Sequence, residues 1–407
     1  MRGIVGVDLN TGIVESVANA VVLTGAKCVV FGQDTRESGI KIREIMTKIM
    51  QNNGIFTLNL GIIPSASMAF LTPKLGADLG IMITASHNPP EHNGINIYDK
   101  HGEILGGMEL EKFDSHVDYC ISNLTRISKE QINGKIQAWE DYVFQKFEPI
   151  FKGKTLPHIA IDFANGSGAN VALDVLQRLG FTVDAYHNKP NGNNSNKNCG
   201  SQHPEAFKRA ISKKPFGVGF AYDGDADRVA CFTNKGVLIP SDAIIGVLGL
   251  NLGLKQVIST VMMNTGVERY LQSKKIGVTR TNVGERFLIP ELKKYKPTEV
   301  IGGESSSHFI FPDILLRGDS LITTLKLLQI LVQTGKTIEE LIKDIPMWFS
   351  VLHNTEIDIE GGEKKEKDYR VLIRKSGTEK LTRVFVEATT EQKRDEILAQ
   401  ILQNKHM

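Results

Sequence analysis

Three aspartates lie close together in one short segment, and carboxylates at this spacing could hold a metal ion. Asp223, Asp225 and Asp227 alternate with small residues in the run DGDADR, and Arg228 is the cationic residue next to them. Like charges about 4 Å apart repel each other by roughly 4 kcal/mol at an effective dielectric constant of 20. A cation would relieve that repulsion, and a ligand set made only of oxygen favours Mg²⁺ over zinc. A solvated acidic loop is the alternative.

A second segment offers a nucleophile. Ser86 lies in the run TASHNPPEHNG, Thr84–Gly94, directly before His87 and close to two prolines. A serine on a rigid loop after a strand can be presented to a substrate at low entropic cost. Asn, Pro, His and Gly also form ordinary turns, so this segment alone leaves an unreactive turn open.

Two further segments carry groups that bind phosphate or hydroxyl oxygens. The run RKSGTEKLTR at 374–383 combines guanidinium groups and hydroxyls with backbone N–H groups around Ser376–Thr378, which could cradle a phosphate. A surface turn with two solvated arginines is the alternative. The run GGESSSH, Gly302–His308, offers a carboxylate, hydroxyls and an imidazole, which suit the hydroxyls of a sugar.

The chain repeats one pattern three times, and each repeat leads to one of these segments. Strand, loop, helix and strand follow one another within Lys27–Pro64, His158–Asn188 and Gln256–Val283. This alternation predicts βαβ units with largely parallel sheets and right-handed crossovers. After each unit a further apolar strand delivers one polar loop. Ligands of open α/β sheets lie at the carboxyl ends of the strands, so we expect the three loops to share one site. Three unrelated βαβ domains with ordinary turns are the alternative.

The tail from about Met347 differs from the rest. Its run Ile357–Asp368 is rich in charge and is expected to form an exposed loop, followed by a strand, a polar loop, a strand and a helix. This order predicts a small α+β domain. We also expect the helix Ala138–Phe151 to link the first two units. The domains are therefore placed at 1–136, 137–240, 241–346 and 347–407.

Composition excludes several classes of partner. The 407 residues carry a net charge of only +2, which gives no excess to bind nucleic acid or membranes. The apolar stretch Ala243–Leu254 is far shorter than the roughly 20 residues of a transmembrane helix. The N-terminus lacks the apolar segment of a secretory signal. Four scattered cysteines, without a CxxC pair, indicate a reduced, cytoplasmic protein, which we expect to be a monomer or a homodimer.

Taken in this order, the four segments resemble those of the α-D-phosphohexomutase superfamily over nearly the whole chain. The resemblance implies an α/β fold of four domains around a central cleft, namely three related mixed α/β domains and a small C-terminal α+β domain. It implies a phosphoserine at Ser86 whose phosphate, with Asp223, Asp225 and Asp227, binds Mg²⁺. It also implies a sugar-binding loop and a phosphate-binding loop, whose expected residues are Gly303, Glu304, Ser306 and His308, and Arg374, Ser376, Gly377, Thr378 and Arg383.

The implied activity is an isomerase reaction that moves a phosphoryl group between O1 and O6 of a hexose phosphate. It would pass through a bound hexose 1,6-bisphosphate, which turns over in the cleft while one phosphate loop on a mobile fourth domain receives either end. The runs Cys199–Glu205 and Val283–Arg286 are more similar to those of phosphoglucosamine mutases than to those of phosphomannomutases or phosphoglucomutases, which are the alternative. A further alternative is a sugar-phosphate-binding or regulatory protein that has lost turnover.

Three positions depart from the family pattern. Asn96 stands where relatives usually have a lysine that is thought to assist proton transfer, and an amide cannot take that role. His87, His101, Arg2 or Arg228 would have to compensate, and His87 is preferred because it adjoins Ser86 and an imidazole titrates near neutrality. In the sugar loop, Ser305 matches neither subgroup and Ser307 replaces a glycine, and in the phosphate loop Lys380 replaces a proline.

Overall fold

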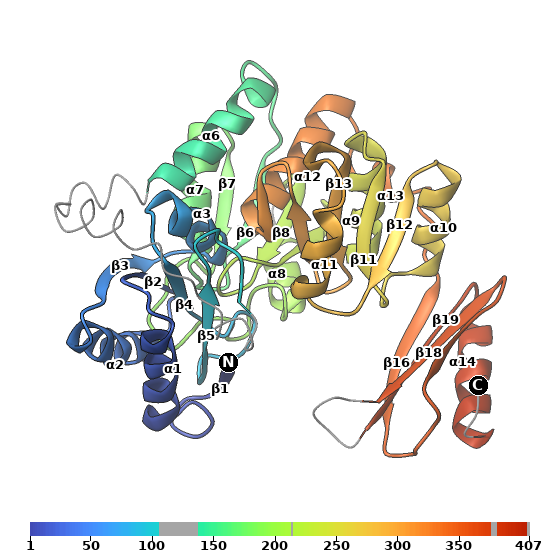
Figure 1. Cartoon of the computed structure of the whole chain (residues 1–407). Coiled ribbons are helices and arrows are strands. Elements are labelled where there is room, and N and C mark those ends of the chain that lie inside the picture. Colours follow the sequence, from blue (N-terminus) through green and yellow to red (C-terminus); the bar gives the residue numbers. More distant parts are fainter. Residues whose placement is uncertain (106–136, 213–214, 376–380, 405–407) are drawn as a thin grey trace.

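The computed structural model describes residues 1–105, 137–212, 215–375 and 381–404, and it contains four sheets in chain order. Three five-stranded sheets form an arch, and the fourth, four-stranded sheet lies across the opening from the first (Figure 1). We call these parts the first, second, third and fourth units. None of the described helices combines the length and apolar character needed to cross a membrane.

The first three sheets follow one plan, as the repeated pattern predicts. Their strand orders are β3-β2-β4-β5-β1, β7-β6-β8-β9-β10 and β12-β11-β13-β14-β15. In each order the first three strands pair in parallel, and each of the last two strands pairs antiparallel with the strand before it. The three polar loops therefore occupy equivalent places, since they are the connections β4–β5, β8–β9 and β13–β14. This repetition brings the loops to the same end of each sheet.

The first unit begins with a short strand that pairs with β5 and so places Arg2 beside Gly94. Its inner strands β2 and β4 are buried along their whole length, as expected for strands covered on both faces. The elements are β1 Arg2–Ile4, α1 Thr11–Leu23, β2 Cys28–Gln33, α2 Ser38–Asn52, β3 Phe56–Ile62, α3 Ser65–Lys74, β4 Leu79–Ile83 and β5 His92–Tyr98.

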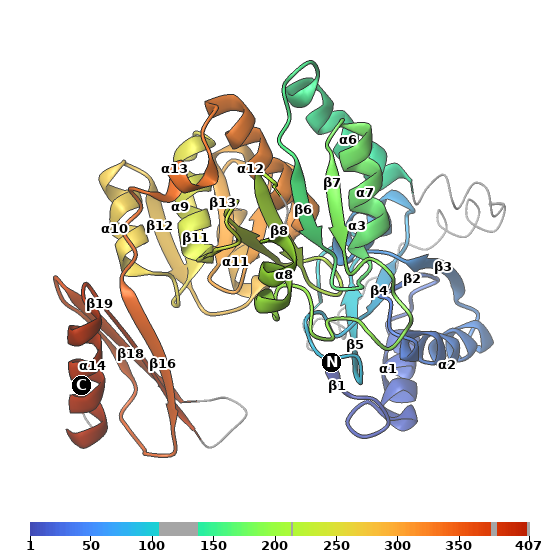
Figure 2. The same cartoon turned by 180° about the vertical axis from the view of Figure 1, so that it is seen from behind.

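The second unit starts with α6, the helix that the sequence predicts at the link between units. Seen from behind, α6 and α7 lie side by side along the second sheet (Figure 2). The elements are α6 Ala138–Phe151, β6 Ile159–Asp162, α7 Gly168–Arg178, β7 Val183–Tyr186, α8 Pro204–Ile211, β8 Val218–Tyr222, β9 Val229–Phe232 and β10 Leu238–Ile239.

Most residues of helix α12 in the third unit are buried, and its N-cap Asp319 accepts a hydrogen bond from the Ile322 N–H. The elements are α9 Ser241–Asn251, β11 Gln256–Thr260, α10 Thr265–Ser273, β12 Gly277–Thr281, α11 Glu285–Leu292, η2 Pro297–Glu299, β13 Val300–Glu304, β14 His308–Phe311, β15 Leu315–Gly318, α12 Ser320–Thr334 and α13 Ile338–Ile342.

One apolar core joins the first three units. Side chains of α6, α7, α9 and α12 form a single buried cluster, and Ala66 of α3 belongs to it. Within this cluster the rings of Phe70, Trp139 and Tyr142 pack together, with centroids 5.0–6.0 Å apart. Because separating these units would expose that surface to water, we expect the first three to move as one body.

The fourth unit has its own small core, between one face of its sheet and α14. Its order, β16-β19-β18-β17, is wholly antiparallel. The expected exposed loop at 357–368 is wrong in part, because Gly362–Lys365 forms the edge strand β17, and the strand β16 was not expected. The charged residues of β17 remain largely exposed, which is typical of an edge strand. The elements are β16 Phe349–Thr355, β17 Gly362–Lys365, β18 Tyr369–Lys375, β19 Thr382–Ala388 and α14 Glu391–Asn404.

Buried charges attach the fourth unit to the third. The side chains of Arg370 on β18 and Glu387 on β19 are completely buried and lie 3.0 Å apart. Glu387 also accepts hydrogen bonds from the N–H and the hydroxyl of Thr265, the first residue of α10, at 3.0 and 2.6 Å. Arg370 donates to the Val261 carbonyl at 2.6 Å. A carboxylate at a helix N-terminus is favourable, so this pair fixes the orientation of the fourth unit.

We predict that Glu387→Gln lowers the free energy of unfolding of the fourth unit by about 3–5 kcal/mol, because it leaves the buried Arg370 guanidinium without its buried partner. The urea dependence of amide hydrogen exchange in β18 and β19 measures the free energy of unfolding of this unit. The control is Glu391→Gln, which removes an exposed partner of Arg394 and should change stability by less than about 1 kcal/mol. Equal effects of the two variants would contradict the prediction.

Candidate active site

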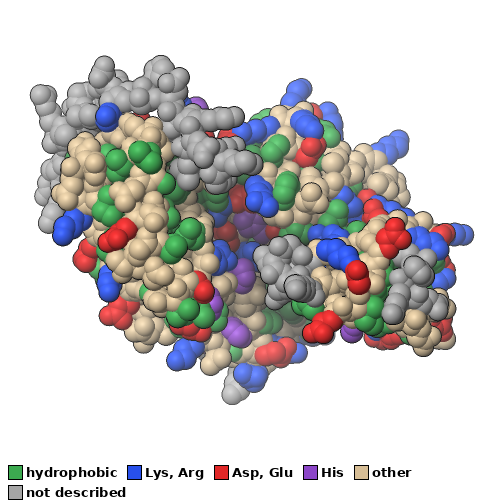
Figure 3. Space-filling model, turned by 60° about the horizontal axis from the view of Figure 1, so that its bottom comes forward, with side chains coloured by type: hydrophobic (Ala, Val, Ile, Leu, Met, Phe, Trp, Pro, Cys, Tyr) green, Lys and Arg blue, Asp and Glu red, His purple; other side chains and the backbone are tan. Residues whose placement is uncertain are grey.

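The three equivalent loops meet in one place. The backbone of Arg228 pairs with that of His308, and the Val229 N–H donates to the Ser307 carbonyl at 2.9 Å, which joins the second loop to the third. The Ser65 N–H donates to the Asp225 carbonyl at 3.0 Å, which joins the first unit to the second loop. Viewed from the open side, the molecule is hollowed between the first and fourth units, with acidic and histidine side chains in the hollow (Figure 3).

Ser86 points at the carboxylates. Its hydroxyl donates to Asp223 Oδ2 at 2.8 Å and lies 3.2 Å from Nδ1 of His87. Its backbone has a φ of 51°, in the left-handed region, and its N–H donates to the hydroxyl of Thr84 at 2.8 Å. A non-glycine residue in this region is uncommon and is typical of functional loops. The sequence analysis placed Ser86 and the acidic loop in one site, and this hydrogen bond is a direct contact between them.

Residues that the sequence analysis did not single out hold the serine loop in place. Arg36 donates to the carbonyls of Ser86 and Asn88 and forms an ion pair with Asp34. Asn196, from a long loop of the second unit, donates to the same two carbonyls at 2.8 and 3.1 Å. The run Asp34–Arg36 directly follows the buried strand β2, the parallel neighbour of β4. A polar run at the carboxyl end of that strand was the feature of the sequence that could have indicated its place beside the serine loop.

The three aspartates converge as expected. One oxygen from each of Asp223, Asp225 and Asp227 lies within 4.8 Å of the others, and all three residues are buried. Oδ1 of Asp225 and Oδ1 of Asp227 are buried without a hydrogen-bond donor. Burial and then the two neighbouring carboxylates raise the pKa of Asp223 well above its usual value, and burial and Asp227 raise that of Asp225 to about 6. Buried, mutually repelling oxygens of this kind can hold a divalent cation.

Arg228 is not the only cation at this acidic loop, which corrects the sequence-based view. Arg317, the third residue of β15, donates to Asp227 Oδ2 at 3.1 Å and also forms an ion pair with Glu285. Burial alone would raise the pKa of Asp227, but His308, Arg317 and Arg228 lower it to about 2. Asp227 is therefore ionised and tied to the third unit. No local pattern in the sequence points to Arg317, which is separated from Asp227 by 90 residues.

His308, which is expected to bind sugar, lies between two carboxylates. Its ring nitrogens lie 3.9 Å from Asp227 Oδ2 and 3.7 Å from Glu285 Oε2. Its ring covers Gly318 so closely that a Cβ there would lie 2.2 Å from it. Burial opposes the charged imidazole, but Glu285 and Asp227 outweigh burial and raise the pKa of His308 to about 9. The geometry therefore gives this imidazole the role of joining the second and third loops.

The rest of the sugar loop is held from behind. Glu304 accepts hydrogen bonds from the Gly284 N–H and the Ser306 hydroxyl at 2.9 and 3.0 Å, so its orientation is fixed. Ser305 turns inward and donates to Asp242 at 3.1 Å. Ser307 has a φ of 67°, which explains why glycine suits this position. Gly303 lies inside β13, where a Cβ would come within 2.7 Å of Ile245, so its role there is close packing.

The groups expected to move a proton differ in their surroundings. Burial, then Arg228 and Arg2, lower the pKa of His87 to about 4, so the expectation that it titrates near neutrality is wrong. Asn96 is half-buried on β5, on the same face as Tyr98 by the alternation of a strand. His101 lies on an exposed turn. Arg2 and Arg228 act on His87 electrostatically and so border the serine loop.

Only part of the expected phosphate loop is described. Arg374 and Arg383 pair directly across β18 and β19, which places the two guanidinium groups on one face of the sheet. Arg374 also contacts the sulfur of Met262 in the third unit at 3.4 Å. Ser376, Gly377 and Thr378 lie outside the described residues.

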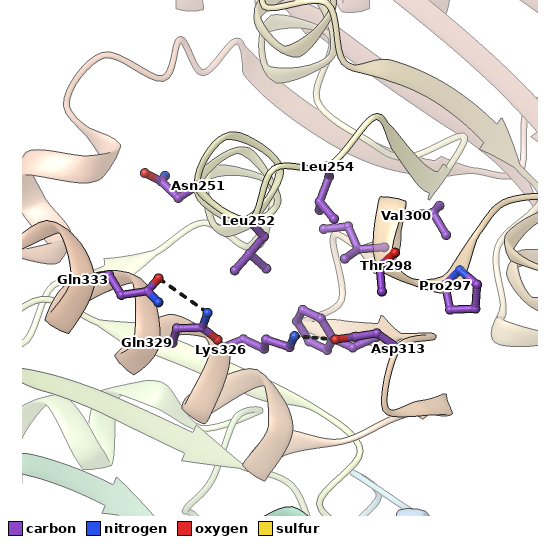
Figure 4. A pocket seen from close by; sticks show the side chains of 12 residues that line it. Asn251, Leu252, Leu254, Pro297, Thr298, Val300, Asp313, Lys326, Gln329 and Gln333 are labelled. Atoms are coloured by element: carbon purple, nitrogen blue, oxygen red, sulfur yellow. Dashed lines mark hydrogen bonds and ion pairs between the residues drawn. The ribbon is translucent and has the colours of Figure 1, made fainter. Parts of the chain in front are cut away.

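A cavity of about 260 Å³ in the third unit holds none of the predicted site residues (Figure 4). It lies between α9, η2 and α12, and Lys326 at its edge is neutralised by Asp313 at 2.7 Å. Its polar side chains are amides, the hydroxyl of Thr298 and one closed ion pair, so it offers no cluster of acids.

Comparison with known families covers nearly the whole chain. Residues 1–117, 139–236 and 240–348 match α/β/α domains I, II and III of phosphoglucomutase/phosphomannomutase, and residues 327–404 match the C-terminal domain. The chain belongs to the phosphoglucomutase/phosphomannomutase family. The predicted family and its four-domain α/β fold are confirmed, while the four domain boundaries expected from sequence remain a prediction.

Two curated relatives are both named phosphoglucosamine mutase. The phosphoglucosamine mutase of Fusobacterium nucleatum is 35% identical over 395 residues, which cover 89% of this chain and 86% of that protein. The phosphoglucosamine mutase of Carboxydothermus hydrogenoformans is 33% identical over 438 residues, which cover 98% of this chain and 97% of that protein. The predicted class of enzyme, a phosphohexomutase among the isomerases, agrees with these relatives.

Solved structures share the fold at lower identity. A phosphoglucomutase/phosphomannomutase family protein from Burkholderia thailandensis superimposes with a TM-score of 0.79 at 21% identity, over 99% of this chain and 95% of that one. Aspergillus fumigatus N-acetylphosphoglucosamine mutase, solved in complex with GlcNAc-6P and magnesium, gives a TM-score of 0.63 at 17% identity, over 83% of this chain and 92% of that one.

We predict that His308→Gln destabilises the protein in a pH-dependent way. A raised pKa of about 9 in the fold, against 6.5 for a free imidazole, means that the charged ring stabilises the fold fully below about pH 6.5. This stabilisation is lost as the pH rises through about 9. The melting temperature of chelator-treated protein should therefore differ most between variant and wild type near pH 6 and converge above about pH 9.

The exposed His203→Gln is the control and should show no such convergence. A deficit for His308→Gln that stays constant from acid to alkaline pH would assign the effect to packing instead.

Proposed function

We propose that the chain interconverts glucosamine 6-phosphate and glucosamine 1-phosphate, with Ser86 as the phosphorylated residue and a hexose 1,6-bisphosphate as bound intermediate. The observation that carries this proposal is the hydroxyl of Ser86, aimed at a buried triad of carboxylates in a chain of this family. The expected cytoplasmic location is part of the proposal and is supported by Cys199 and Cys231, which form no disulfide within the described residues.

The chain's own residues would position and exchange the phosphoryl group. Phosphorylated Ser86 donates its phosphoryl group to the free hydroxyl of a sugar monophosphate, and the serine oxygen takes up the proton which that hydroxyl loses. After the bisphosphate turns over, its other phosphate returns to Ser86. The Ser86 backbone is fixed by Arg36 and Asn196, so the reacting oxygen keeps one position in both transfers. Arg2 and Arg228 provide positive charge beside it.

The triad fits Mg²⁺. Two buried carboxylate oxygens without donors and an all-oxygen ligand set are what a hard divalent cation requires. Asp223, Asp225 and Asp227 would hold the ion together with the phosphate on Ser86. When bound, Mg²⁺ neutralises charge on the transferring phosphoryl group.

The third and fourth units would read the rest of the substrate. Glu304, which accepts the Gly284 N–H, and Ser306, which donates to Glu304, would bind the sugar hydroxyls. Arg374 and Arg383 would bind the phosphate that is not transferred, with Ser376, Gly377 and Thr378 beside them. The choice of glucosamine over glucose or mannose rests on the named relatives.

A protein that binds sugar phosphate without turnover is the second candidate, and Asn96 is the observation that favours it. An amide at this position cannot exchange protons, and the low pKa of His87 makes the imidazole a weak base. Both candidates bind sugar phosphate, and they differ in whether the protein converts it.

We predict that Ser86→Ala abolishes both labelling and turnover. Incubation with glucosamine 1,6-bisphosphate should add one phosphate per wild-type chain, seen by intact-mass spectrometry, and none to the variant. Ser212→Ala, which loses an exposed hydroxyl bonded to Arg209, should be labelled like wild type. Labelling that survives Ser86→Ala would overturn the assignment of the serine.

We predict that Asn96→Lys raises turnover, since general acid–base assistance contributes typically about 10²–10⁴-fold. Turnover on glucosamine, glucose and mannose phosphates is compared for wild type, Asn96→Lys and the isosteric control Asn96→Leu between pH 6 and 9. A rise with lysine alone supports a slow mutase. No turnover in any form, with Ser86 still accepting phosphate, would favour the binding protein.

A further inference from the structure

A second cluster of ligand-type side chains lies in the second unit, apart from the acidic triad. Asp162, His187 and Cys199 each present one ligand atom, and these atoms lie within 4.8 Å of one another. Asp162 ends β6, His187 directly follows the parallel strand β7, and Cys199 lies in the long loop before α8. Three chain segments that are distant in sequence therefore bring a carboxylate, an imidazole and a thiol to one point.

The distances suit a tetrahedral metal. Ligand atoms at 2.0–2.3 Å from zinc are separated from each other by about 3.3–3.8 Å. In the structure Asp162 Oδ2 and His187 Nδ1 lie 3.0 Å apart, and all three ligand atoms lie within 4.8 Å of one another, so small side-chain adjustments would bring them to tetrahedral separations. The mixture of sulfur, nitrogen and oxygen selects zinc over Mg²⁺, which takes oxygen ligands only.

The ligand atoms have the partners that metal ligands usually have. Asp162 Oδ1 accepts the Ala164 N–H at 2.8 Å, and its Oδ2 accepts the Gly200 N–H at 2.9 Å. The side-chain amide of Asn165 donates to Cys199 Sγ at 3.8 Å. Such outer hydrogen bonds orient ligands and tune their affinity. Backbone donors thus fix the carboxylate before any metal arrives.

The imidazole lies directly against the carboxylate. His187 Nδ1 is 3.0 Å from Asp162 Oδ2, and the interaction with the Asp162 carboxylate raises the pKa of the His187 imidazole against the effect of burial. A zinc ion held by both side chains and by the thiol would replace the proton that lies between them. The His187 side chain is 35% exposed, which leaves an entry path and room for a water as fourth ligand.

We propose that Asp162, His187 and Cys199 bind one zinc ion per chain, at a site separate from the acidic triad. Binding releases the thiol proton of Cys199 and uses the neutral imidazole. The same loop carries Asn196, which donates to the Ser86 and Asn88 carbonyls, so the metal fixes the loop that supports the serine. This proposal does not depend on the activity proposed above.

Cobalt(II) tests the site, because a thiolate ligand gives a charge-transfer band in the near ultraviolet that oxygen ligands do not give. The full chain is stripped with a chelator, saturated with Mg²⁺ to fill the acidic triad, and titrated with Co²⁺. Wild type should show the thiolate band with one equivalent of Co²⁺, and added Zn²⁺ should abolish it. Wild type without this band would overturn the proposal.

Variants separate this site from other thiols. Cys199→Ala should lose the band, whereas Cys231→Ala, which removes another buried thiol, should keep it. His187→Asn, at a partly exposed position that should fold, should keep the band and weaken Co²⁺ binding by more than about 100-fold, since loss of a ligand exceeds the 10–100-fold effect of outer partners. Unchanged Co²⁺ affinity in folded His187→Asn would overturn the proposal, as would a band that persists in Cys199→Ala.

Discussion

The repulsion among three buried carboxylates is the constraint around which the centre of this protein is built. Asp223, Asp225 and Asp227 are all buried, and ionising them together without a counter-charge is costly. The fold supplies part of that charge through Arg317 and Arg228 and directs both toward Asp227. Asp223 and Asp225 receive neutral donors. Asp223 accepts from the Ser86 hydroxyl and from two backbone N–H groups, and Asp225 accepts from the Ser65 hydroxyl. The distribution leaves a deficit of positive charge on the side of the triad that faces Ser86, where a cation and a phosphate would be accommodated.

The repeated sheet plan explains how this centre can be assembled from distant segments. Each of the first three units delivers its loop between its third parallel strand and the following antiparallel strand. Antiparallel pairing holds both ends of each loop, as in the pairs Ile83–Ile95, Tyr222–Val229 and Glu304–His308. The shared apolar core of these units then fixes the loops relative to one another. Precision in the centre therefore comes from backbone pairing, while side chains adjust the charge.

Much of this architecture could be predicted from the sequence because its signals are local. The alternation of strands and helices located the three repeats, and the spacing of DGDADR located the converging carboxylates. Arg317 and Asn196 could not be found this way, because each acts through a contact with a residue of another unit that is 90 or more positions away. The low pKa of His87 was missed for the same reason, since it arises from burial and from arginines of other segments. The edge strand β17 was missed because its exposed, charged sequence resembles a loop.

The attachment of the fourth unit differs in kind from the packing of the other three, and this difference bears on motion. Opening an apolar interface exposes its surface to water at a cost proportional to the area. Opening the interface around Arg370 and Glu387 breaks charge-assisted hydrogen bonds, but water then solvates both groups and returns much of the desolvation penalty. A polar interface can therefore hold the two units in one defined orientation when closed and still open at a moderate cost in free energy. Arg374 and Arg383, which we propose bind the phosphate that is not transferred, lie on the same sheet as this pair. A strict closed state would then set where that phosphate is held, and opening would release it.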